Sequence, residues 1–395
     1  MNISEIQNLR IQKLQAMMAK DGVDATLYAT SGNMQYFLGD GSYYWHRTSE
    51  TGGGLSANDI GSSRDGHALN KPDCILYIPA DDQPILFLTY DKLDIMRYLP
   101  IKQIPSYFAM LGNKLEPYIK GKKRIAVGES CAKALKTMLG SFDNTIEITD
   151  GENYGEKLRV IKDSGEVAKL RRAAEFTDNA MGIVTKALKP GITPAEVREL
   201  IEAIGLNAGA QSISFGAAVI CVEPGKPGSE ELFSYPEDKP IQEGTAIGFD
   251  YGYVLDGYVS DYGRSFFVGR NQQAKEAYKA LQEAQLHLLD MIKPGMPLNM
   301  CYDVLFDKLE TKSLGKYLRK AEPCLVMGHQ IGIDIHERPW LRGDVQGVFQ
   351  PGMVICIEPK IMWPGLCYLR CEDMVLVTEN GCESLTKFDR ELFEL

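Results

Sequence analysis

The sequence predicts a mixed α/β (α+β) protein built from two domains. Its 395 residues are too many for one ordinary hydrophobic core. Residues 1–154 carry strand patterns interspersed with helical ones, which is typical of an α/β domain. Residues 155–395 contain two successive helix–turn–helix patterns, each followed by strands. This weak internal repetition indicates a second domain made of two similar halves.

The first domain should begin with a helix over residues 3–21, because Ser4 can cap it and its apolar residues recur at helical spacing. A second helix is expected near residues 130–139. Apolar runs of strand length occupy residues 24–29, 74–79, 84–90, 123–127 and 145–149. These elements form the α/β unit that should end near Tyr154.

Residues 40–71 interrupt this regular pattern. The segment contains three consecutive glycines and almost no apolar periodicity, and it also carries Trp45, His46 and Arg47. An irregular stretch of this length inside a compact domain is often functional. We interpret it as a lid-like loop, with a surface excursion of no special role as the alternative.

The second domain should open with helices. Four are expected, over residues 164–188, 193–208, 272–292 and 298–312. Ser164 is a plausible N-cap for the first of them. Pro-Gly sequences at residues 190–191 and 294–295 should end the first and third helices, because proline and glycine do not continue a helix.

A β-hairpin is predicted over residues 247–266, with Asp256-Gly257 as its turn. Its arms carry Asp250 and Asp261 among apolar residues. A carboxylate in an apolar strand is costly unless a cation neutralises it. Arg264 could supply that cation in a structural ion pair, or a metal ion could do so, and the hairpin alone does not decide between them.

Three later strand-like runs each place one more metal-binding side chain among apolar residues, namely His329, Glu358 and Glu372. Together with the two aspartates they form an oxygen-rich set with a single imidazole. Four carboxylates exceed the needs of one tetrahedral zinc ion and suit a pair of divalent ions of manganese, cobalt, iron or zinc. Cys356, Cys371 and Cys382 lie in the same runs. We interpret them as small core residues, with thiolate ligation as the alternative.

This ordered set resembles the pita-bread metallopeptidase family M24, and within it the Xaa-Pro dipeptidase and creatinase-like branch. The resemblance covers essentially the whole chain. It implies a creatinase/prolidase-like domain over residues 1–154 and a pita-bread catalytic domain with pseudo-twofold symmetry over residues 155–395. It further implies that the metal ligands, two of them bridging both ions, are Asp250, Asp261, His329, Glu358 and Glu372, with Asp261 and Glu372 as the bridges.

The resemblance also assigns roles around the metals. Glu358 would take a proton from the attacking water, and His336 would stabilise the tetrahedral intermediate. Arg370 corresponds to a position that binds a substrate carboxylate in prolidase-like members, with an ion pair to an acidic ligand as the alternative. By analogy with creatinase-like homodimers, Trp45, His46 and Arg47 would contact the substrate of the partner subunit.

One departure from the family pattern concerns a histidine. Family peptidases usually carry one in the loop before the aspartate hairpin, but residues 220–236 contain none. Tyr235, or His46 or His67 from the lid-like loop, could take its place. This departure keeps open a small non-peptide substrate, as in creatinase-like C–N hydrolases or dimethylsulfoniopropionate-type lyases, beside the main prediction of an Xaa-Pro peptidase.

The composition of the chain indicates which classes of molecule it does not bind. The net charge of −10 argues against nucleic acid, which needs a basic face. No apolar run approaches the length of a membrane span, and the first residues do not resemble a signal peptide. Nine cysteines without a CxxC pair are typical of reduced thiols, so we expect a cytoplasmic protein. The family resemblance implies that its partner is a small peptide or another small molecule.

Overall fold

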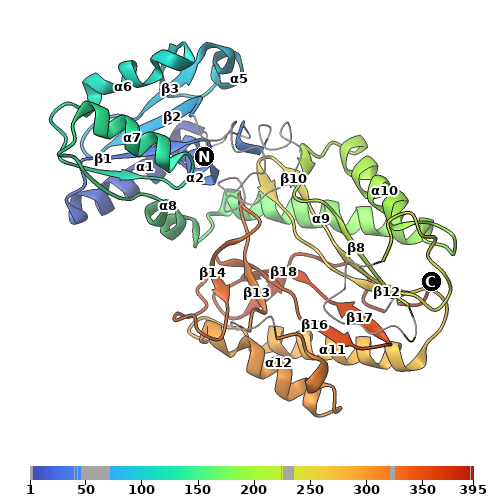
Figure 1. Ribbon diagram of the computed structural model, residues 1–395. Coiled ribbons are helices and arrows are strands. Elements are labelled where there is room, and N and C mark those ends of the chain that lie inside the picture. Colours follow the sequence, from blue (N-terminus) through green and yellow to red (C-terminus); the bar gives the residue numbers. More distant parts are fainter. Residues whose placement is uncertain are drawn as a thin grey trace. The chain divides into compact units, whose positions relative to one another are not determined.

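The structure of the protein is a computed structural model, which describes residues 3–39, 41, 43–45, 72–223, 225, 235–320, 325–391 and 393–395. The chain divides into two compact units, Met1–Arg159 and Val160–Leu395 (Figure 1). Each unit has its own sheets and its own buried apolar residues.

Unit 1 is built on a six-stranded sheet with strand order β4-β3-β2-β1-β5-β6. The central strands β1, β2 and β3 pair antiparallel, whereas β4, β5 and β6 pair parallel to their neighbours. The strands are β1 (Ala25–Ala29), β2 (Cys74–Pro79), β3 (Ile85–Thr89), β4 (Lys102–Ser106), β5 (Arg124–Val127) and β6 (Glu147–Asp150). The helices are α1 (Ile3–Asp21), α2 (Gly32–Leu38), α5 (Leu93–Met96), α6 (Leu111–Ile119), α7 (Ala132–Phe142) and α8 (Glu152–Arg159).

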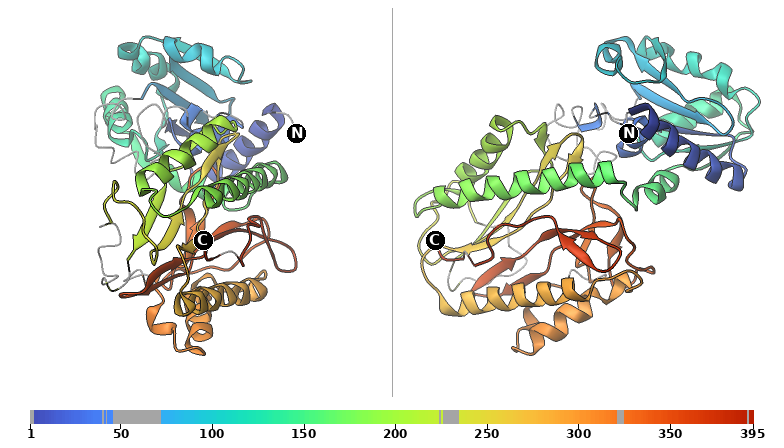
Figure 2. Two further views of the ribbon diagram at one scale, coloured as in Figure 1. Left: turned by 90° about the vertical axis from the view of Figure 1, so that its right-hand side faces the viewer. Right: turned by 180° about the vertical axis from the view of Figure 1, so that it is seen from behind.

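Unit 2 places its strands between two pairs of helices, α9 with α10 and α11 with α12 (Figures 1 and 2). The helices are α9 (Ser164–Ala187), α10 (Pro194–Asn207), α11 (Gln272–Met291) and α12 (Cys301–Glu310). Capping boxes begin α9 and α10, in which the N-cap side chain and a glutamate three residues later bond each other's backbone. The N-cap of α9 is Asp163 rather than the predicted Ser164, because the Asp163 carboxylate accepts a hydrogen bond from the Glu166 N–H.

The strands of unit 2 form two three-stranded sheets, one five-stranded sheet and one two-stranded sheet. The first half contributes β7 (Ser212–Ile213), β8 (Ala218–Val222), β9 (Ala246–Asp250), β10 (Tyr253–Leu255), β11 (Tyr258–Val259) and β12 (Ser265–Phe267). The second half contributes β13 (Gly328–Gln330), β14 (Glu337–Leu341), β15 (Val354–Ile357), β16 (Lys360–Trp363), β17 (Cys367–Arg370), β18 (Asp373–Val377) and β19 (Cys382–Ser384). The five-stranded sheet has the order β14-β13-β15-β18-β19.

The predicted aspartate hairpin is present. Strands β9 and β12 pair antiparallel, and β10 and β11 continue the two arms to the turn. Asp256 and Gly257 form this turn with φ values of 51° and 73°, which match a type I′ turn. The hairpin fixes the register of its two arms, and therefore the positions of Asp250 and Asp261.

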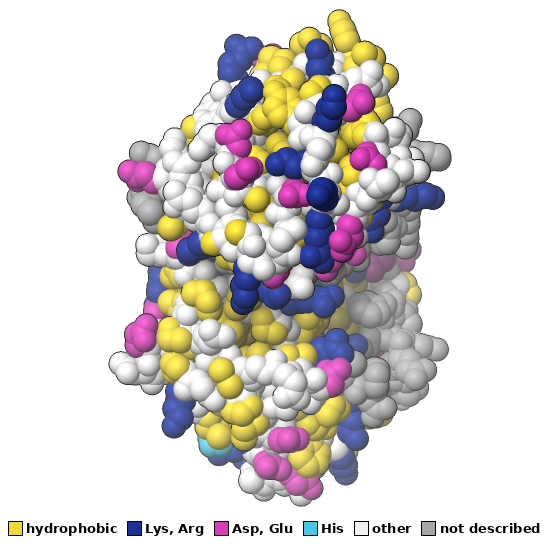
Figure 3. All heavy atoms as spheres, turned by 90° about the vertical axis from the view of Figure 1, so that its left-hand side faces the viewer, with side chains coloured by type: hydrophobic (Ala, Val, Ile, Leu, Met, Phe, Trp, Pro, Cys, Tyr) yellow, Lys and Arg dark blue, Asp and Glu magenta, His cyan; other side chains and the backbone are white. Residues whose placement is uncertain are grey.

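Two further observations concern the charged side chains on the surface and the length and polarity of the helices. The face in Figure 3 carries both basic and acidic side chains and does not present an uninterrupted basic surface. Within the part of the chain that the structure describes, no helix is both long and apolar enough to cross a membrane.

Gly252 lies directly against the opposite arm of the hairpin. A Cβ atom at this position would lie 1.8 Å from the carbonyl oxygen of Ser260 and 2.5 Å from the hydroxyl oxygen of Ser214. The Ser214 N–H also donates to the Gly252 carbonyl at 2.9 Å. Because backbone atoms cannot rotate away as a side chain can, this position accepts only glycine without a shift of the hairpin.

We therefore predict that Gly252→Ala destabilises unit 2 by about 2 kcal/mol or more, through the backbone shift that the added methyl group forces. Denaturant unfolding followed by intrinsic fluorescence measures this. Gly216→Ala is the matched control, since nothing lies within 4 Å of a Cβ there, and it should change stability by less than about 0.5 kcal/mol. Equal unfolding midpoints for the two variants would contradict the prediction.

Candidate metal centre

The five side chains predicted as ligands come from separate strands of unit 2. Asp250 ends β9, and His329 is the middle residue of β13. Asp261 follows β11, Glu358 follows β15, and Glu372 precedes β18. Backbone pairing draws these strands together, because the Glu358 N–H bonds the Met327 carbonyl and the Glu372 N–H bonds the Gly263 carbonyl.

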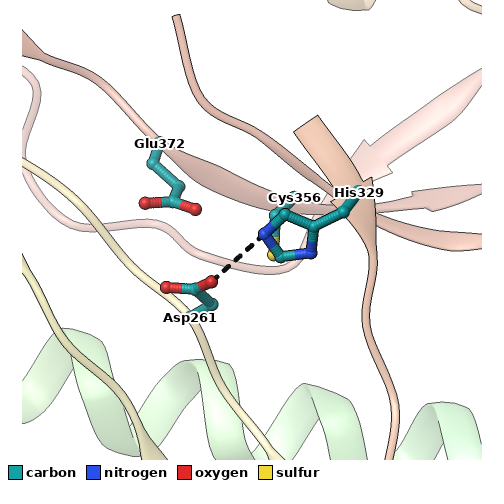
Figure 4. Close-up of side chains that lie close together, drawn as sticks. All are labelled: Asp261, His329, Cys356 and Glu372. Atoms are coloured by element: carbon teal, nitrogen blue, oxygen red, sulfur yellow. Dashed lines mark ion pairs between the residues drawn. The ribbon is translucent and has the colours of Figure 1, made fainter. Parts of the chain in front are cut away.

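The structure brings Asp261, His329 and Glu372 into one buried cluster. Their donor atoms, together with Sγ of Cys356, all lie within 4.8 Å of one another (Figure 4). His329 Nε2 is 3.4 Å from Asp261 Oδ2, and Nδ1 lies 3.0 Å from the Gln330 carbonyl oxygen. A proton held on Nδ1 by that carbonyl leaves Nε2 directed at the carboxylates, which is the arrangement that metal-binding imidazoles use.

Arg370 joins the other two predicted ligands to this cluster. Its guanidinium donates to Glu372 Oε2 at 2.8 Å, to Glu358 Oε2 at 2.7 Å, and to Asp250 Oδ2. Of the two roles considered for Arg370, the ion pair with acidic side chains is the one present in this structure. A grip on a substrate carboxylate would require the guanidinium to leave these partners.

A second cation, Lys360, also contacts the cluster. Its ammonium group donates to Glu358 Oε2. Lys360 and Arg370 are directly opposite each other in the β16–β17 pair, so both side chains leave the same face of that hairpin. The sequence analysis did not identify Lys360, although its position two residues after Glu358 was a usable signal.

The carboxylates outnumber these cations. Among the described residues, the lysine and arginine side chains beside Asp250, Asp261, Glu358 and Glu372 are Arg370 and Lys360, and Asp261 faces His329. Two negative charges therefore remain when all four acids are ionised and His329 is neutral. One oxygen on each of three of them, Asp250 Oδ1, Asp261 Oδ1 and Glu372 Oε1, is buried without a hydrogen-bond partner among the described residues. Unpaired buried oxygens of this kind fit divalent cations, which prefer carboxylate donors.

The pKa values of the acids follow from this crowding. Burial raises the pKa of Asp250 to about 7, against the opposing effect of Arg370. Burial and the neighbouring Asp261 raise the pKa of Glu372 well above its usual value. The pKa of Glu358 is lowered in spite of burial, because Lys360 and Arg370 favour its charged form.

His336 lies at the edge of the cluster. Its ring is perpendicular to that of His329, with ring centroids 4.5 Å apart. Trp340, which the sequence analysis did not single out, has its ring centroid 4.9 Å from that of His336 and 5.3 Å from that of His329. Both His336 and Trp340 are half-buried, so an aromatic surface adjoins the cluster.

A buried ion pair fixes the segment that carries His336. Lys162 donates to Glu337 Oε2 at 3.0 Å and to Gln330 Oε1 at 3.1 Å. The other Glu337 oxygen accepts the N–H groups of Ile333 and Asp334. Because Lys162 and Glu337 are 1% and 6% exposed, water contributes little to solvating either charge.

Arg264 and Asp373 form a second buried pair behind Glu372. The guanidinium of Arg264 donates to Asp373 Oδ1 at 2.6 Å and to the Glu372 carbonyl at 2.5 Å. Arg264 therefore holds the backbone of Glu372 and does not neutralise the hairpin aspartates. This arrangement answers the question that the hairpin sequence left open about Arg264.

The residues predicted to contact substrate are placed as follows. Trp45 is fully buried in unit 1, with its ring tilted against Tyr44 at 5.2 Å. The Tyr235 hydroxyl donates to the Pro240 carbonyl at 2.9 Å. His46, Arg47 and His67, with most of segment 40–71, lie outside the described residues.

The sequence profile of metallopeptidase family M24 matches residues 168–379, which hold all five predicted ligands. The chain belongs to metallopeptidase family M24. Members of this family are hydrolytic enzymes that use a pair of metal ions, so the predicted enzyme class, a metal-dependent peptidase, is confirmed. The comparisons do not favour the non-peptide alternative.

Relatives and solved structures extend this similarity over the whole chain. An Xaa-Pro dipeptidase of Pyrococcus furiosus is 26% identical over 384 residues, covering 97% of this chain and 99% of that one. An uncharacterized peptidase of Staphylococcus aureus is 31% identical and covers 75% of this chain and 80% of its own. The solved Xaa-Pro dipeptidase from Bacillus anthracis matches with a TM-score of 0.81 at 22% identity, over 98% of this chain and 100% of that one. The predicted fold class is confirmed.

We predict that Lys162→Met destabilises unit 2 by about 3–5 kcal/mol, because it removes the ammonium group that contacts the buried Glu337 carboxylate. Chemical denaturation of the metal-free protein measures the loss. The double variant Lys162→Met/Glu337→Gln should recover much of it, since a neutral amide oxygen can still accept the Ile333 N–H. A double variant as unstable as the single one would show that the charge imbalance is not the cause.

Proposed function

We propose that this M24 enzyme is an Xaa-Pro dipeptidase-like peptidase that hydrolyses the amide bond of small peptides. The observation that carries the proposal is a set of three carboxylate oxygens, on Asp250, Asp261 and Glu372, that are buried without a hydrogen-bond partner among the described residues. Asp261 and Glu372 also cluster with His329. Support for the substrate comes from the Pyrococcus furiosus Xaa-Pro dipeptidase, which is similar over 97% of the chain.

In this proposal five residues hold two divalent ions. The residues that would hold them are Asp250, Asp261, His329, Glu358 and Glu372, as the family resemblance implies. Manganese is the expected metal, with cobalt, iron and zinc as alternatives that oxygen-rich sites with one imidazole also accept. Lys360 and Arg370 would then remain beside the ligands and orient their carboxylates.

The bound ions would lower the pKa of a shared water and polarise the substrate carbonyl. Glu358 would accept a proton from the attacking water, and the contact with Lys360 favours the ionised carboxylate that this role needs. His336 faces the cluster edge-on to His329 and donates a hydrogen bond to the oxygen on which negative charge develops. The half-buried indole of Trp340 offers an apolar surface beside this position.

The remaining substrate contacts and the assembly rest on the family resemblance. Trp45, His46 and Arg47 of the segment 40–71 would contact the substrate of the partner subunit in a homodimer, which for Trp45 requires that its side chain leave its buried position in unit 1. Tyr235 would stand in for the missing family histidine. Arg370 is the alternative grip for a substrate carboxylate. The cytoplasm is the proposed location, since none of the described cysteines is paired in a disulfide.

The proposal predicts metal-dependent release of proline from Xaa-Pro dipeptides by protein that has been stripped with a chelator and reloaded with manganese. His329→Ala should lower kcat/KM by about 100-fold or more and reduce the bound metal, because it removes the only imidazole ligand. His287→Ala is the matched control, since His287 is exposed on α11. If the protein binds two ions but releases proline from none of the Xaa-Pro dipeptides tested, the proposed substrate is wrong. The proposed metal centre would still be supported.

Metal affinity should also fall as the pH drops. Asp250 has a pKa near 7 in the metal-free protein, so below that pH a proton must leave before a cation can bind. We expect affinity for manganese to decrease by up to about tenfold per pH unit below pH 7, with proton release on binding. Calorimetric titration in buffers of different ionisation enthalpy measures both quantities. Asp250→Asn should flatten the pH dependence, and an unchanged slope in this variant would assign the proton to another group.

A further inference from the structure

Cys356 lies inside the candidate metal centre. It is completely buried, and its Sγ belongs to the same group of donor atoms as Asp261, His329 and Glu372, all within 4.8 Å of one another. Figure 4 shows its sulfur beside the His329 ring, on the side of the two carboxylates. This thiol therefore faces the cluster and not an apolar core.

The strand geometry accounts for this position. Cys356 is directly opposite His329 in the β13–β15 pair, so the two side chains leave the same face of the sheet. Residues two apart along a strand also share a face, which places Cys356 on the same side as Glu358. The five-stranded sheet thus presents three donor side chains together, from His329, Cys356 and Glu358.

Two neighbouring cysteines behave differently. The Cys371 thiol donates to Gln285 Oε1 at 3.0 Å, and the Cys382 thiol donates to the Leu289 carbonyl at 3.2 Å. Both are therefore engaged with α11, away from the carboxylates. The prediction that the cysteines of these strands are ordinary core residues fits these two and does not fit Cys356.

The unpartnered oxygens independently indicate that this cluster binds a cation. Asp261 and Glu372 are 2% and 0% exposed, and Oδ1 of one and Oε1 of the other have no hydrogen-bond partner within the described ranges. A cation between them would satisfy both oxygens. The sulfur of Cys356 lies within reach of the same point.

The spacing suits coordination. Metal bonds of 2.0–2.3 Å to nitrogen, oxygen and sulfur place the donors of a tetrahedral ion roughly 3.2–3.8 Å apart. The separation of 3.4 Å between His329 Nε2 and Asp261 Oδ2 already lies in that range. The other separations, at most 4.8 Å, need small side-chain rotations to reach it.

We infer that Cys356 is a further metal ligand and that it makes the two ion positions chemically different. This inference rests on the proposed metal centre. The ion bound by His329 would have nitrogen, sulfur and oxygen donors and would prefer zinc or cobalt, because thiolate selects softer ions. The ion bound by Asp250 would have oxygen donors only and would prefer manganese. The thiol proton passes to solvent as the metal–sulfur bond forms, and no electron is transferred.

Cobalt provides a direct probe of the sulfur bond. Metal-free wild-type protein loaded with Co(II) should show a sulfur-to-cobalt charge-transfer band in the near ultraviolet. Cys356→Ser should lose that band, and Cys371→Ser, the matched control, should keep it. A band that persists in Cys356→Ser, or its absence from the wild type with cobalt bound, would overturn the inference and leave the proposed function intact.

A competition experiment tests the preference for different ions. With limiting zinc and manganese in equal amounts, elemental analysis of the wild type should find about one ion of each. In Cys356→Ser, the preference for zinc over manganese should be about tenfold weaker. X-ray absorption of the zinc-loaded wild type requires no variant to fold, and it should show a Zn–S distance of about 2.3 Å. A zinc shell of nitrogen and oxygen alone would overturn the inference. Failure of the wild type to bind any of these metals would instead overturn the metal centre itself.

Discussion

The concentration of negative charge between the two halves of unit 2 is the constraint on which the rest of this structure depends. Four carboxylates approach each other in a region that water does not reach freely, and each carries a large desolvation cost when ionised. Arg370 and Lys360 offset only part of this charge. Burial and the remaining negative charge raise the pKa values of Asp250 and Glu372. Three carboxylate oxygens also lack a hydrogen-bond partner among the described residues.

Such a cluster requires a scaffold that resists relaxation. The acids and His329 are carried by strands and strand ends, whose backbone groups are already paired with neighbouring strands. Buried ion pairs then restrain the segments between the strands, with Arg264 holding the backbone of Glu372 and Lys162 holding the segment before β14. Close approaches at Gly252 and at Gly263, where a Cβ would lie 2.6 Å from the Arg370 guanidinium, leave little room for adjustment.

The sequence predicted those features that local pattern determines. Turn chemistry at Asp256-Gly257 identified the hairpin, and isolated polar residues in apolar runs identified the four acids and the histidine that the structure gathers. Features that depend on contacts between distant segments were not predictable. Lys162 and Glu337 are 175 residues apart in sequence, and neither residue type indicates burial. Whether a thiol such as Cys356 faces a core or a cluster depends on strand pairing, which the pattern of a single strand does not contain.

Helix boundaries show the same limit on a smaller scale. Asp163 and Ser164 are both good N-caps by residue type, and only the reciprocal bond with Glu166 distinguishes them.

Trp340 has the pattern of an ordinary strand residue until its pairing with His329 across β13 and β14 is known. That pairing places its indole beside two imidazoles, at the edge of the candidate metal centre.

The cross-strand pair of Lys360 and Arg370 has a consequence for how the enzyme matures. Because these tethered counterions contact three of the acids, we expect the fold to depend less on its metal than that of small zinc domains, which are unfolded without their ion. On this expectation, metal supply and protein synthesis need not coincide. The ions available to the folded chain would then decide which form of the enzyme results.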